Sequence, residues 1–503
     1  MQVRCGPSAL VVGTLVAAFS VGAEQPAEIQ ASWPQFRGVN ACGVSHDESP
    51  LPVEFGRENA LWATPLPPGH SSPCIWGDRV FLTGFDREAG RLETFCLDRH
   101  SGEILWRRPA PANEIEKVHP ISTPANATPA TDGERVYVYF GSFGLLCYDF
   151  TGRELWQLPQ PAPLTPYGSG SSPIVADEYV VLSCEQPPRP VVLAVDRRTG
   201  REAWRHACLP YLPGYATPVV WDHDETREVI LHTSVGVTAL RLQDGSRQWW
   251  VSMLSAASST PAVAPDRLFV AACWPGGEPQ DRVPLPEFDQ AQSRYDADGD
   301  GEIDRQELPA DLLIVRRAEV GDILGAEIPL ARAFNFFDAD GDGRYDRAEW
   351  ARAVEFSRRG REHGLLAVRP GGQGDVTHSH VMWRESRSVA EVPSPLVYRG
   401  QVYMIKDGGI VSCLEAASGR LLYRTRLGPR GAYFASPVAG DGKIYAASCG
   451  GVVTVLAAGE TFQVLAGNDL REPIFATPAI AAGKLYIRTE QRLYAFGPIN
   501  PKP

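Results

Sequence analysis

Two short acidic segments carry residues whose types and spacing suit a hard metal ion. Each has Asp at positions 1, 3, 5 and 9, Gly at position 6 and Glu at position 12. Calcium takes roughly six to eight oxygen ligands, and this spacing wraps monodentate carboxylates and one bidentate Glu around a single ion. The predicted calcium-binding positions are Asp296, Asp298, Asp300, Glu302, Asp304 and Glu307 in the first segment, and Asp338, Asp340, Asp342, Arg344, Asp346 and Glu349 in the second.

Position 7 of such a loop contributes its backbone carbonyl, so the side chains of Glu302 and Arg344 are not expected to be ligands. Asp304 and Asp346 at position 9 act directly or through a water. The pattern therefore predicts two Ca²⁺ sites. Extracellular modules bind calcium at about 10⁻⁴ to 10⁻³ M, which favours a structural ion over a sensor.

Elements on both sides of each loop must position these ligands. Apolar side chains spaced three to four residues apart predict a helix before and after each loop. They are Leu285, Phe288 and Tyr295 before the first loop, Leu308, Leu312 and Val315 after it, Leu330, Phe334 and Phe337 before the second, and Trp350 and Val354 after that one. Two such units form a pair, in which Ile303 is expected to face Tyr345.

Composition places the rest of the chain among soluble globular proteins. Of 503 residues, 44% are hydrophobic and 21% charged, which excludes disorder and multiple membrane spans. The net charge of −12 comes largely from residues 278–362, which hold no Lys. Nucleic-acid binding needs an extended basic face, so the charge excludes it.

The N-terminus has the pattern of a secretory signal. Arg4 precedes an apolar run at residues 9–21, and small residues follow at 21–23. The run is too short to span a bilayer, which takes about 20 residues. Cleavage after residue 23 predicts an exported protein, periplasmic or secreted, with no transmembrane segment in the mature chain.

The chain also repeats itself. Ser-Pro or Thr-Pro steps recur 41 to 56 residues apart, with one gap of 134 residues. A propeller blade takes about 44 residues, so the long gap holds an insertion of about 90 residues. The steps begin at Ser72, Thr128, Ser172, Thr217, Thr260, Ser394, Ser436 and Thr477. The prediction is a mainly β fold, an eight-bladed β-propeller of four-stranded blades with an inserted α-helical EF-hand domain.

A Trp stands four residues after a Gly in several repeats, as at Gly152 and Trp156. An aromatic residue at a fixed strand position is expected to fill the wedge between blades. The last repeat has three strands, and residues 58–62 resemble residues 152–156. Residues 58–62 are therefore predicted to close the ring as the missing fourth strand.

The predicted domains follow from these patterns. They are a signal peptide at 1–23, an N-terminal arm at 24–57, propeller at 58–273, the EF-hand pair at 274–363, propeller again at 364–497 and a tail at 498–503.

The repeats, with Asp196, Thr199, Gly200 and Trp204 as their fullest example, resemble the PQQ-like β-propeller family. That family includes the quinoprotein alcohol dehydrogenases and the BamB subunit of the outer-membrane assembly machinery. The run Trp-Pro-Gln-Phe-Arg-Gly at 33–38 also resembles the opening of exported bacterial members. The resemblance covers residues 33–273 and 364–497, and it implies the fold more firmly than the function.

Two functions follow from this resemblance. The favoured one is a calcium-binding scaffold for another extracytoplasmic protein or envelope component. The alternative is a PQQ- and calcium-dependent oxidoreductase acting on alcohols or sugars. The family's dehydrogenases carry adjacent cysteines beside the quinone, and this sequence has none. PQQ is thus possible but not favoured, and no catalytic residues are predicted.

One face of the propeller carries the loops before each Pro step and after each second strand, where a ligand is expected. Candidate residues on it are His70, Lys117, His119, Tyr167, Glu185, Tyr215, Lys406, Asp407, Tyr433, Arg488 and Glu490. Three thiols that share a slot nearer the axis, Cys184, Cys273 and Cys449, leave a soft-metal site as a further alternative.

Overall fold

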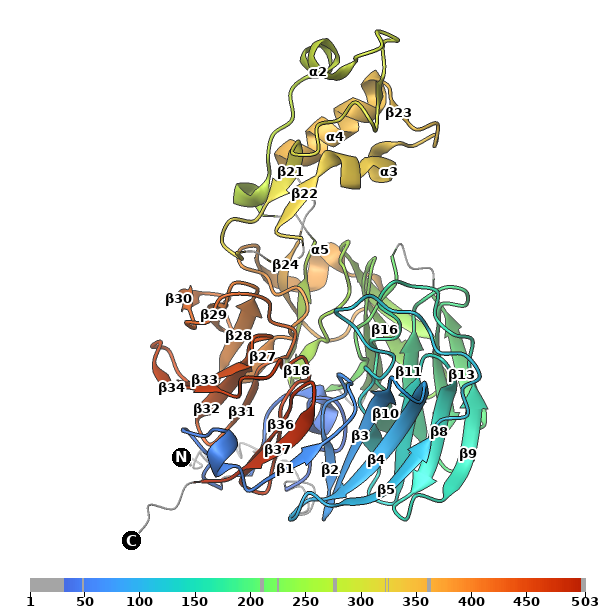
Figure 1. Cartoon of the computed structure of the whole chain (residues 1–503), viewed down its shortest axis with the longest axis vertical. Coiled ribbons are helices and arrows are strands. Elements are labelled where there is room, and N and C mark those ends of the chain that lie inside the picture. The colour runs from blue at the N-terminus through green and yellow to red at the C-terminus, as the bar shows by residue number, and fades with distance from the viewer. Residues whose placement is uncertain are drawn as a thin grey trace, which may run out of the picture.

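The computed structural model describes residues 31–47, 49–208, 212–223, 226–274, 278–321, 323, 325–359 and 363–498. The predicted signal peptide lies outside these ranges. Within them, the structure has no helix with the length and apolar character needed to cross a bilayer. Figure 1 shows a ring of sheets with a smaller module standing on one face.

The ring is an eight-bladed propeller, as the repeats predict. Each blade is an antiparallel sheet of four strands, and the fourth blade gains a fifth, parallel strand. The first four blades are β2 (Cys74–Trp76), β3 (Arg79–Asp86), β4 (Arg91–Asp98) and β5 (Ile104–Pro109); β6 (Ala130–Thr131), β7 (Arg135–Phe140), β8 (Gly144–Asp149) and β9 (Glu154–Pro159); β10 (Ile174–Ala176), β11 (Tyr179–Cys184), β12 (Val191–Asp196) and β13 (Glu202–Ala207); and β14 (Val219–His223), β15 (Thr226–Thr233), β16 (Gly236–Arg241), β17 (Arg247–Ser252) and β25 (Gly374–Asp375).

The remaining blades are β18 (Ala262–Ala264), β19 (Arg267–Ala272), β24 (Gly364–Val368) and β26 (Val381–Glu385); β27 (Leu396–Tyr398), β28 (Gln401–Lys406), β29 (Ile410–Glu415) and β30 (Leu421–Arg426); β31 (Val438–Gly440), β32 (Lys443–Ala447), β33 (Val452–Ala457) and β34 (Val464–Asp469); and β35 (Ala479–Ala481), β36 (Lys484–Arg488), β37 (Arg492–Phe496) and β1 (Trp62–Pro65). The short helix α5 (Thr377–His380) precedes β26.

The hydroxyl residues of the Ser-Pro and Thr-Pro steps form a ring around the axis and are linked by a series of hydrogen bonds. From Ser72 to Ser436, the backbone N–H of each residue donates to the hydroxyl of the corresponding residue in the next blade, at 2.9 to 3.1 Å. Seven of these bonds lead from Ser72 round to Thr477. The repeat therefore conserves a hydroxyl because each blade uses it to hold its neighbour.

Tryptophans hold the outer parts of neighbouring blades together. The Trp156 indole N–H donates to the carbonyl of Arg197 in the next blade at 3.2 Å. Its ring packs against Gly200, where φ is 69° and an added Cβ would come within 2.6 Å of the indole. Trp62, Trp106, Trp204 and Trp383 make the same two contacts with the blades that follow them. Trp106, Trp156 and Trp204, which follow a Gly by four residues, are therefore structural, as predicted.

An N-terminal strand closes the ring, but it begins later than predicted. Residues 57–59 form a 3₁₀ turn, η2 (Arg57–Asn59), in which the Gly56 N–H donates to the Asn59 side chain at 2.7 Å. That turn includes residues 58 and 59, which were expected to belong to the closing strand. The closing strand is β1, whose Trp62 lies opposite Ala495 of β37. Trp62 is thus the one residue shared by the predicted and observed strands.

A buried arginine reinforces this closure. Arg488 in the eighth blade donates to the Ser71 hydroxyl and to the Thr83 carbonyl of the first blade, both at 2.6 Å. It also donates to the Pro67 carbonyl at 3.0 Å. Burial lowers the pKa of Arg488 to about 9. Arg488, expected on the ligand face, instead joins the last blade to the first.

The described part of the N-terminal arm crosses the face opposite the module (Figure 1). Trp33 bridges to Ile75 in the first blade, and Val44 bridges to Ala439 in the seventh. Between them, Arg37 is fully buried and donates to the Pro395 carbonyl of the sixth blade at 2.7 Å. The 3₁₀ turn η1 (Val39–Ala41) lies in this stretch. The arm therefore ties distant blades together across the axis.

The inserted module has its own hydrophobic core, made of residues between Leu285 and Val354. Its elements are η3 (Pro279–Asp281), α2 (Phe288–Tyr295), β20 (Ile303–Asp304), β21 (Leu313–Arg316), β22 (Glu327–Pro329), η4 (Leu330–Arg332), α3 (Phe334–Phe337), β23 (Arg344–Tyr345) and α4 (Arg347–Arg359). Figure 1 shows the module joined to the propeller at one end.

The helix predicted after the first loop is wrong. Residues 313–316 form strand β21, which pairs with β22 as a hairpin. Pro309 directly follows Leu308, and the residue before a proline is disfavoured in helical conformation. The second loop is followed by α4, which contains no proline and forms as predicted.

The hydroxyl ring predicts the effect of removing one of its members. Thr217→Val keeps the side-chain shape but leaves the buried Ser172 N–H without its acceptor. We expect a loss of about 1–3 kcal/mol in the free energy of unfolding, measured by urea titration. The matched control is Thr151→Val, which removes an exposed hydroxyl outside the ring. Equal effects of the two substitutions would contradict a stabilising role of the ring.

Candidate calcium sites and axial cavity

The module places its two acidic loops side by side. The short strands β20 and β23 pair so that Ile303 lies opposite Tyr345, as predicted, and Asp304 lies opposite Arg344. The side chains of Ile303 and Tyr345 are both buried in the module core. This pairing ties the conformation of one loop to that of the other.

Both loops fold in the same way around their first aspartate. The Asp296 carboxylate accepts from the backbone N–H groups of Gly299 and Gly301, at 2.7 and 3.0 Å. Asp338 accepts from Gly341 and Gly343 at 2.8 and 3.1 Å. The Gly at position 6 has φ of 95° in the first loop and 86° in the second, a left-handed conformation that favours glycine.

The glutamate at position 12 folds back over each loop. The two Glu307 oxygens accept from the N–H groups of Ala297 and Asp304 at 2.7 and 2.8 Å. Glu349 accepts from Ala339 at 2.7 Å in the same way. A carboxylate that spans the loop with both oxygens is placed as a bidentate calcium ligand requires.

The carboxylates also converge. Ligand oxygens of Asp296, Asp298 and Glu307 lie within 4.8 Å of one another, as do those of Asp338, Asp340 and Asp342. These are all hard oxygen donors, so the residues present fit calcium. The remaining predicted positions, Asp300, Glu302, Asp304, Arg344, Asp346 and Glu349, lie in the same two loops but outside these groups of three. The full ligand assignment stays a prediction.

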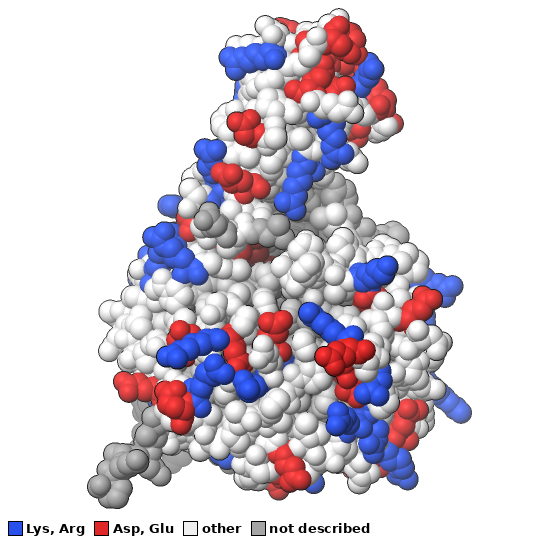
Figure 2. All heavy atoms as spheres, viewed as in Figure 1, with Lys and Arg blue, Asp and Glu red and all other residues white. Residues whose placement is uncertain are grey.

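Arg344 has a contact that loop spacing alone does not reveal. Its guanidinium forms an ion pair with Asp300 of the other loop and lies 3.6 Å from Glu302. The residue at position 7 of the second loop therefore holds a predicted ligand of the first. Figure 2 shows that acidic side chains gather over the far end of the module, where these loops lie.

A cavity of about 790 Å³ lies on the propeller axis beneath the module. All eight Ser and Thr residues of the Pro steps line it. Its walls are largely apolar and aromatic, and they include Tyr167, Tyr215, Phe434 and Phe475. Phe36 of the arm also lines the cavity. The cavity thus runs between the arm on one face and the module on the other.

Four of the candidate residues on the ligand face line this cavity: His70, Tyr167, Tyr215 and Asp407. His70 stacks on Phe475 with ring centroids 4.5 Å apart. Burial and the neighbouring Arg488 and Arg87 lower the pKa of His70 to about 3, so the ring is neutral at physiological pH. Lys117, His119, Glu185, Lys406, Tyr433 and Glu490 are not among the cavity's lining residues.

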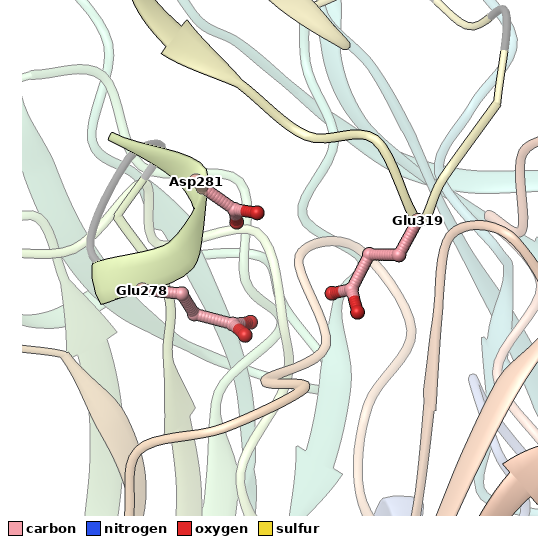
Figure 3. A group of neighbouring side chains, drawn as sticks. All are labelled: Glu278, Asp281 and Glu319. Atoms are coloured by element: carbon pink, nitrogen blue, oxygen red, sulfur yellow. The ribbon is translucent and has the colours of Figure 1, made fainter. Parts of the chain in front are cut away.

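Lys406 instead holds the module to the propeller. Its ammonium lies 2.6 Å from a Glu278 oxygen, 2.5 Å from a Glu319 oxygen and 3.8 Å from an Asp281 oxygen. Figure 3 shows these three carboxylates pointing toward one another, Glu278 and Asp281 from the turn at η3 and Glu319 from the segment after β21. Their oxygens are close enough to hold a metal, but Lys406 already supplies the cation.

The charges of this junction affect one another. Burial lowers the pKa of Lys406, but Glu278 and Glu319 outweigh that effect and raise it above its ordinary value. Burial raises the pKa of Asp281 to about 6, although Lys406 opposes the shift. One lysine therefore neutralises only part of the charge of three carboxylates.

The three cysteines that share one slot are not brought together. Cys449 lines the axial cavity, whereas Cys184 lines a separate cavity between the second and third blades. All nine cysteines among the described residues are free thiols. No cluster of metal-ligating side chains in the described ranges contains a cysteine, so the soft-metal alternative has no support there.

Family comparisons agree with this architecture. The family described as outer membrane protein assembly factor BamB matches residues 55–210 and 95–273, and the EF-hand family matches residues 293–310 and 330–354. No curated protein matches the chain in sequence at a significant level.

Solved structures share the fold at low identity. BamB from Moraxella catarrhalis is 13% identical with a TM-score of 0.51, and the match covers 88% of this chain and 99% of BamB. A europium-containing methanol dehydrogenase is 12% identical with a TM-score of 0.55, covering 93% of this chain and 98% of that enzyme. The quinohemoprotein alcohol dehydrogenase ADHIIG from Pseudomonas putida is 12% identical with a TM-score of 0.51, covering 95% and 84%. Similarity at this level shows the fold alone.

The loop geometry predicts which substitutions remove a calcium ion. Glu307→Gln and Glu349→Gln each weaken a bidentate contact, so each variant is expected to bind one ion fewer in isothermal titration calorimetry. The circular dichroism of the propeller should not change. The matched control is Glu302→Gln, because position 7 acts through its carbonyl, and it should bind as many ions as the unaltered protein. Unchanged stoichiometry in both position-12 variants would contradict the assignment.

Proposed function

We propose that this PQQ-like β-propeller with an inserted EF-hand pair is an exported calcium-binding scaffold for another extracytoplasmic protein or envelope component. The BamB-type repeats and the predicted signal peptide support this proposal. The observation that carries it is the module itself. Two complete EF-hand loops stand on one face of the ring and enlarge the surface that a protein partner can contact.

Calcium has a structural role in this proposal. Each loop concentrates several carboxylates that repel one another, and a divalent cation offsets that repulsion. The proposed ligands are the carboxylates of Asp296, Asp298, Asp300, Asp304 and Glu307, those of Asp338, Asp340, Asp342, Asp346 and Glu349, and the carbonyls of Glu302 and Arg344. The ion would keep the module ordered for a partner.

The axial cavity favours one second candidate, a PQQ-dependent oxidoreductase. Its volume and aromatic walls suit a small flat ligand. Its two lining carboxylates fit less well. Glu391 is paired with Arg317, and Asp407 accepts from the Tyr433 N–H at 2.7 Å. Among the described lining residues, Asp407 is therefore the one carboxylate outside an ion pair, and it alone would have to serve both as a base and as a metal ligand beside a quinone. The scaffold is therefore the favoured function.

Titration with PQQ separates the two candidates. The purified protein, mixed with PQQ and calcium, is expected to show no stoichiometric quinone absorbance and no dye reduction with alcohols or sugars. Quinone bound at one equivalent together with alcohol-dependent dye reduction would contradict the scaffold and establish the oxidoreductase.

Affinity capture tests the scaffold directly. The mature chain, immobilised in calcium and exposed to an extracytoplasmic extract, should retain a defined protein partner. A bait carrying both Glu307→Gln and Glu349→Gln should retain less of it, because the module would lose order. A Glu302→Gln bait is the matched control. Recovery of nothing beyond what empty beads retain would contradict the proposal.

A further inference from the structure

The EF-hand module forms the roof of the axial cavity. Arg317, Ile323, Ile328 and Arg332 belong to the module, and all four line the cavity together with residues of the propeller. The mouth of the cavity is thus built partly from a segment inserted into the fifth blade. Access to the axis therefore depends on where the module sits.

One short turn brings the module against the propeller. We call residues 317–321, which follow β21, the docking turn. Its Arg317 side chain is 4% exposed and forms an ion pair with Glu391. Its Glu319 contacts Lys406 through the side chain, and its Glu319 carbonyl accepts from Arg426 at 2.9 Å. The docking turn is therefore held by charges from three segments of the propeller.

The fit of the docking turn is close. Gly408 of the propeller has φ of 82°, and an added Cβ there would come within 2.6 Å of the Glu319 carbonyl oxygen. Val320 is fully buried beside it. Only a glycine allows the two backbones to approach in this way. The docking turn and the propeller therefore form a close-packed interface, which we call the seat of the module.

The seat is largely polar, whereas the module's core is separate. The hydrophobic cluster of the module contains only module residues, between Leu285 and Val354. Lifting the module off would exchange ion pairs for water without opening that core. Buried ion pairs lose hydration when they form, so water that solvates both released partners offsets much of the attraction lost when the module lifts. The module can thus leave its seat while staying folded.

The strand that leads into the docking turn is packed against the calcium loops. Ile314 and Val315 of β21 belong to the same hydrophobic cluster as Ile303 and Tyr345, which join the two loops. A loop pair disordered by carboxylate repulsion would loosen the strand that carries the docking turn. A loop pair ordered by calcium would hold it in place, so calcium binds the seated form more tightly.

We propose that the EF-hand module is a calcium-held roof that controls access to the axial cavity, with Lys406 and Arg317 as the contacts that hold it over the mouth. The calcium part rests on the calcium binding proposed above. The seating contacts rest on the described ion pairs alone. The two parts therefore need separate tests.

The reactivity of the Cys449 thiol reports the position of the module, because Cys449 lines the cavity. Burial raises the pKa of Cys449 to about 12, so little thiolate is present and the partly exposed thiol labels at a slow basal rate, which displacement of the module would raise. The mature protein is treated with N-ethylmaleimide in calcium, and labelling at Cys449 is measured by peptide mass mapping. Cys42 in the arm, on the opposite face, serves as the internal control.

Lys406→Met and Glu319→Gln should each speed Cys449 labelling, on the order of tenfold for Lys406→Met, since a closed state that admits a few per cent of open molecules would become largely open. Glu319→Gln is the milder change and guards against misfolding. The matched control is Lys443→Met, which breaks a lysine–aspartate pair elsewhere in the propeller. Labelling of Cys42 should not change in any variant. If Cys449 is labelled in both junction variants at the same rate as in the unaltered protein, the proposal that the module acts as a roof is overturned.

Removing calcium with EGTA should speed Cys449 labelling in the unaltered protein and add little in Lys406→Met. No effect of EGTA would overturn the calcium control. Calorimetry then separates the causes: if the protein binds no calcium, the proposed function fails as well, and if it binds calcium, only this inference fails.

Discussion

The hydrogen bonds from the backbone N–H of one Ser or Thr to the hydroxyl of its counterpart in the next blade are the interaction on which the rest of the structure depends. Each one satisfies a buried backbone N–H with a side chain from the next blade, so no blade completes its own hydrogen bonding at the axis. The seven bonds link the inner strands of all eight blades, and the eight Ser and Thr residues line the central cavity that the arm and the module also meet.

A closed ring also needs its ends joined, and three separate devices join them. Strand β1 completes the eighth blade, Arg488 connects that blade to the first, and the arm crosses the axis through Arg37. Closure removes the open strand edges that otherwise pair with other chains. The outer tryptophans add packing between blades, but they act on a ring that is already closed.

The module follows a different principle from the blades. Blades share apolar contacts with their neighbours, as the clusters that span two blades show. The module's hydrophobic cluster contains module residues alone, and the module meets the propeller through the charged side chains around Lys406 and Arg317 and the buried Val320. A domain attached in this way keeps its own fold and can still respond to what its acidic loops bind.

The sequence by itself determined the features that local spacing encodes. The regular recurrence of the Pro steps and the Gly-to-Trp interval predicted eight blades, and the spacing of acids and glycines located two EF-hand loops, because each unit of these patterns is a short local segment. The tertiary structure alone decided the rest. Arg488 and Ser71 are 417 residues apart, and Lys406 and Glu278 are 128 apart, so no local pattern relates them. The start of β1, the hairpin in place of a helix and the roof over the cavity likewise depend on which distant surfaces meet when the ring closes.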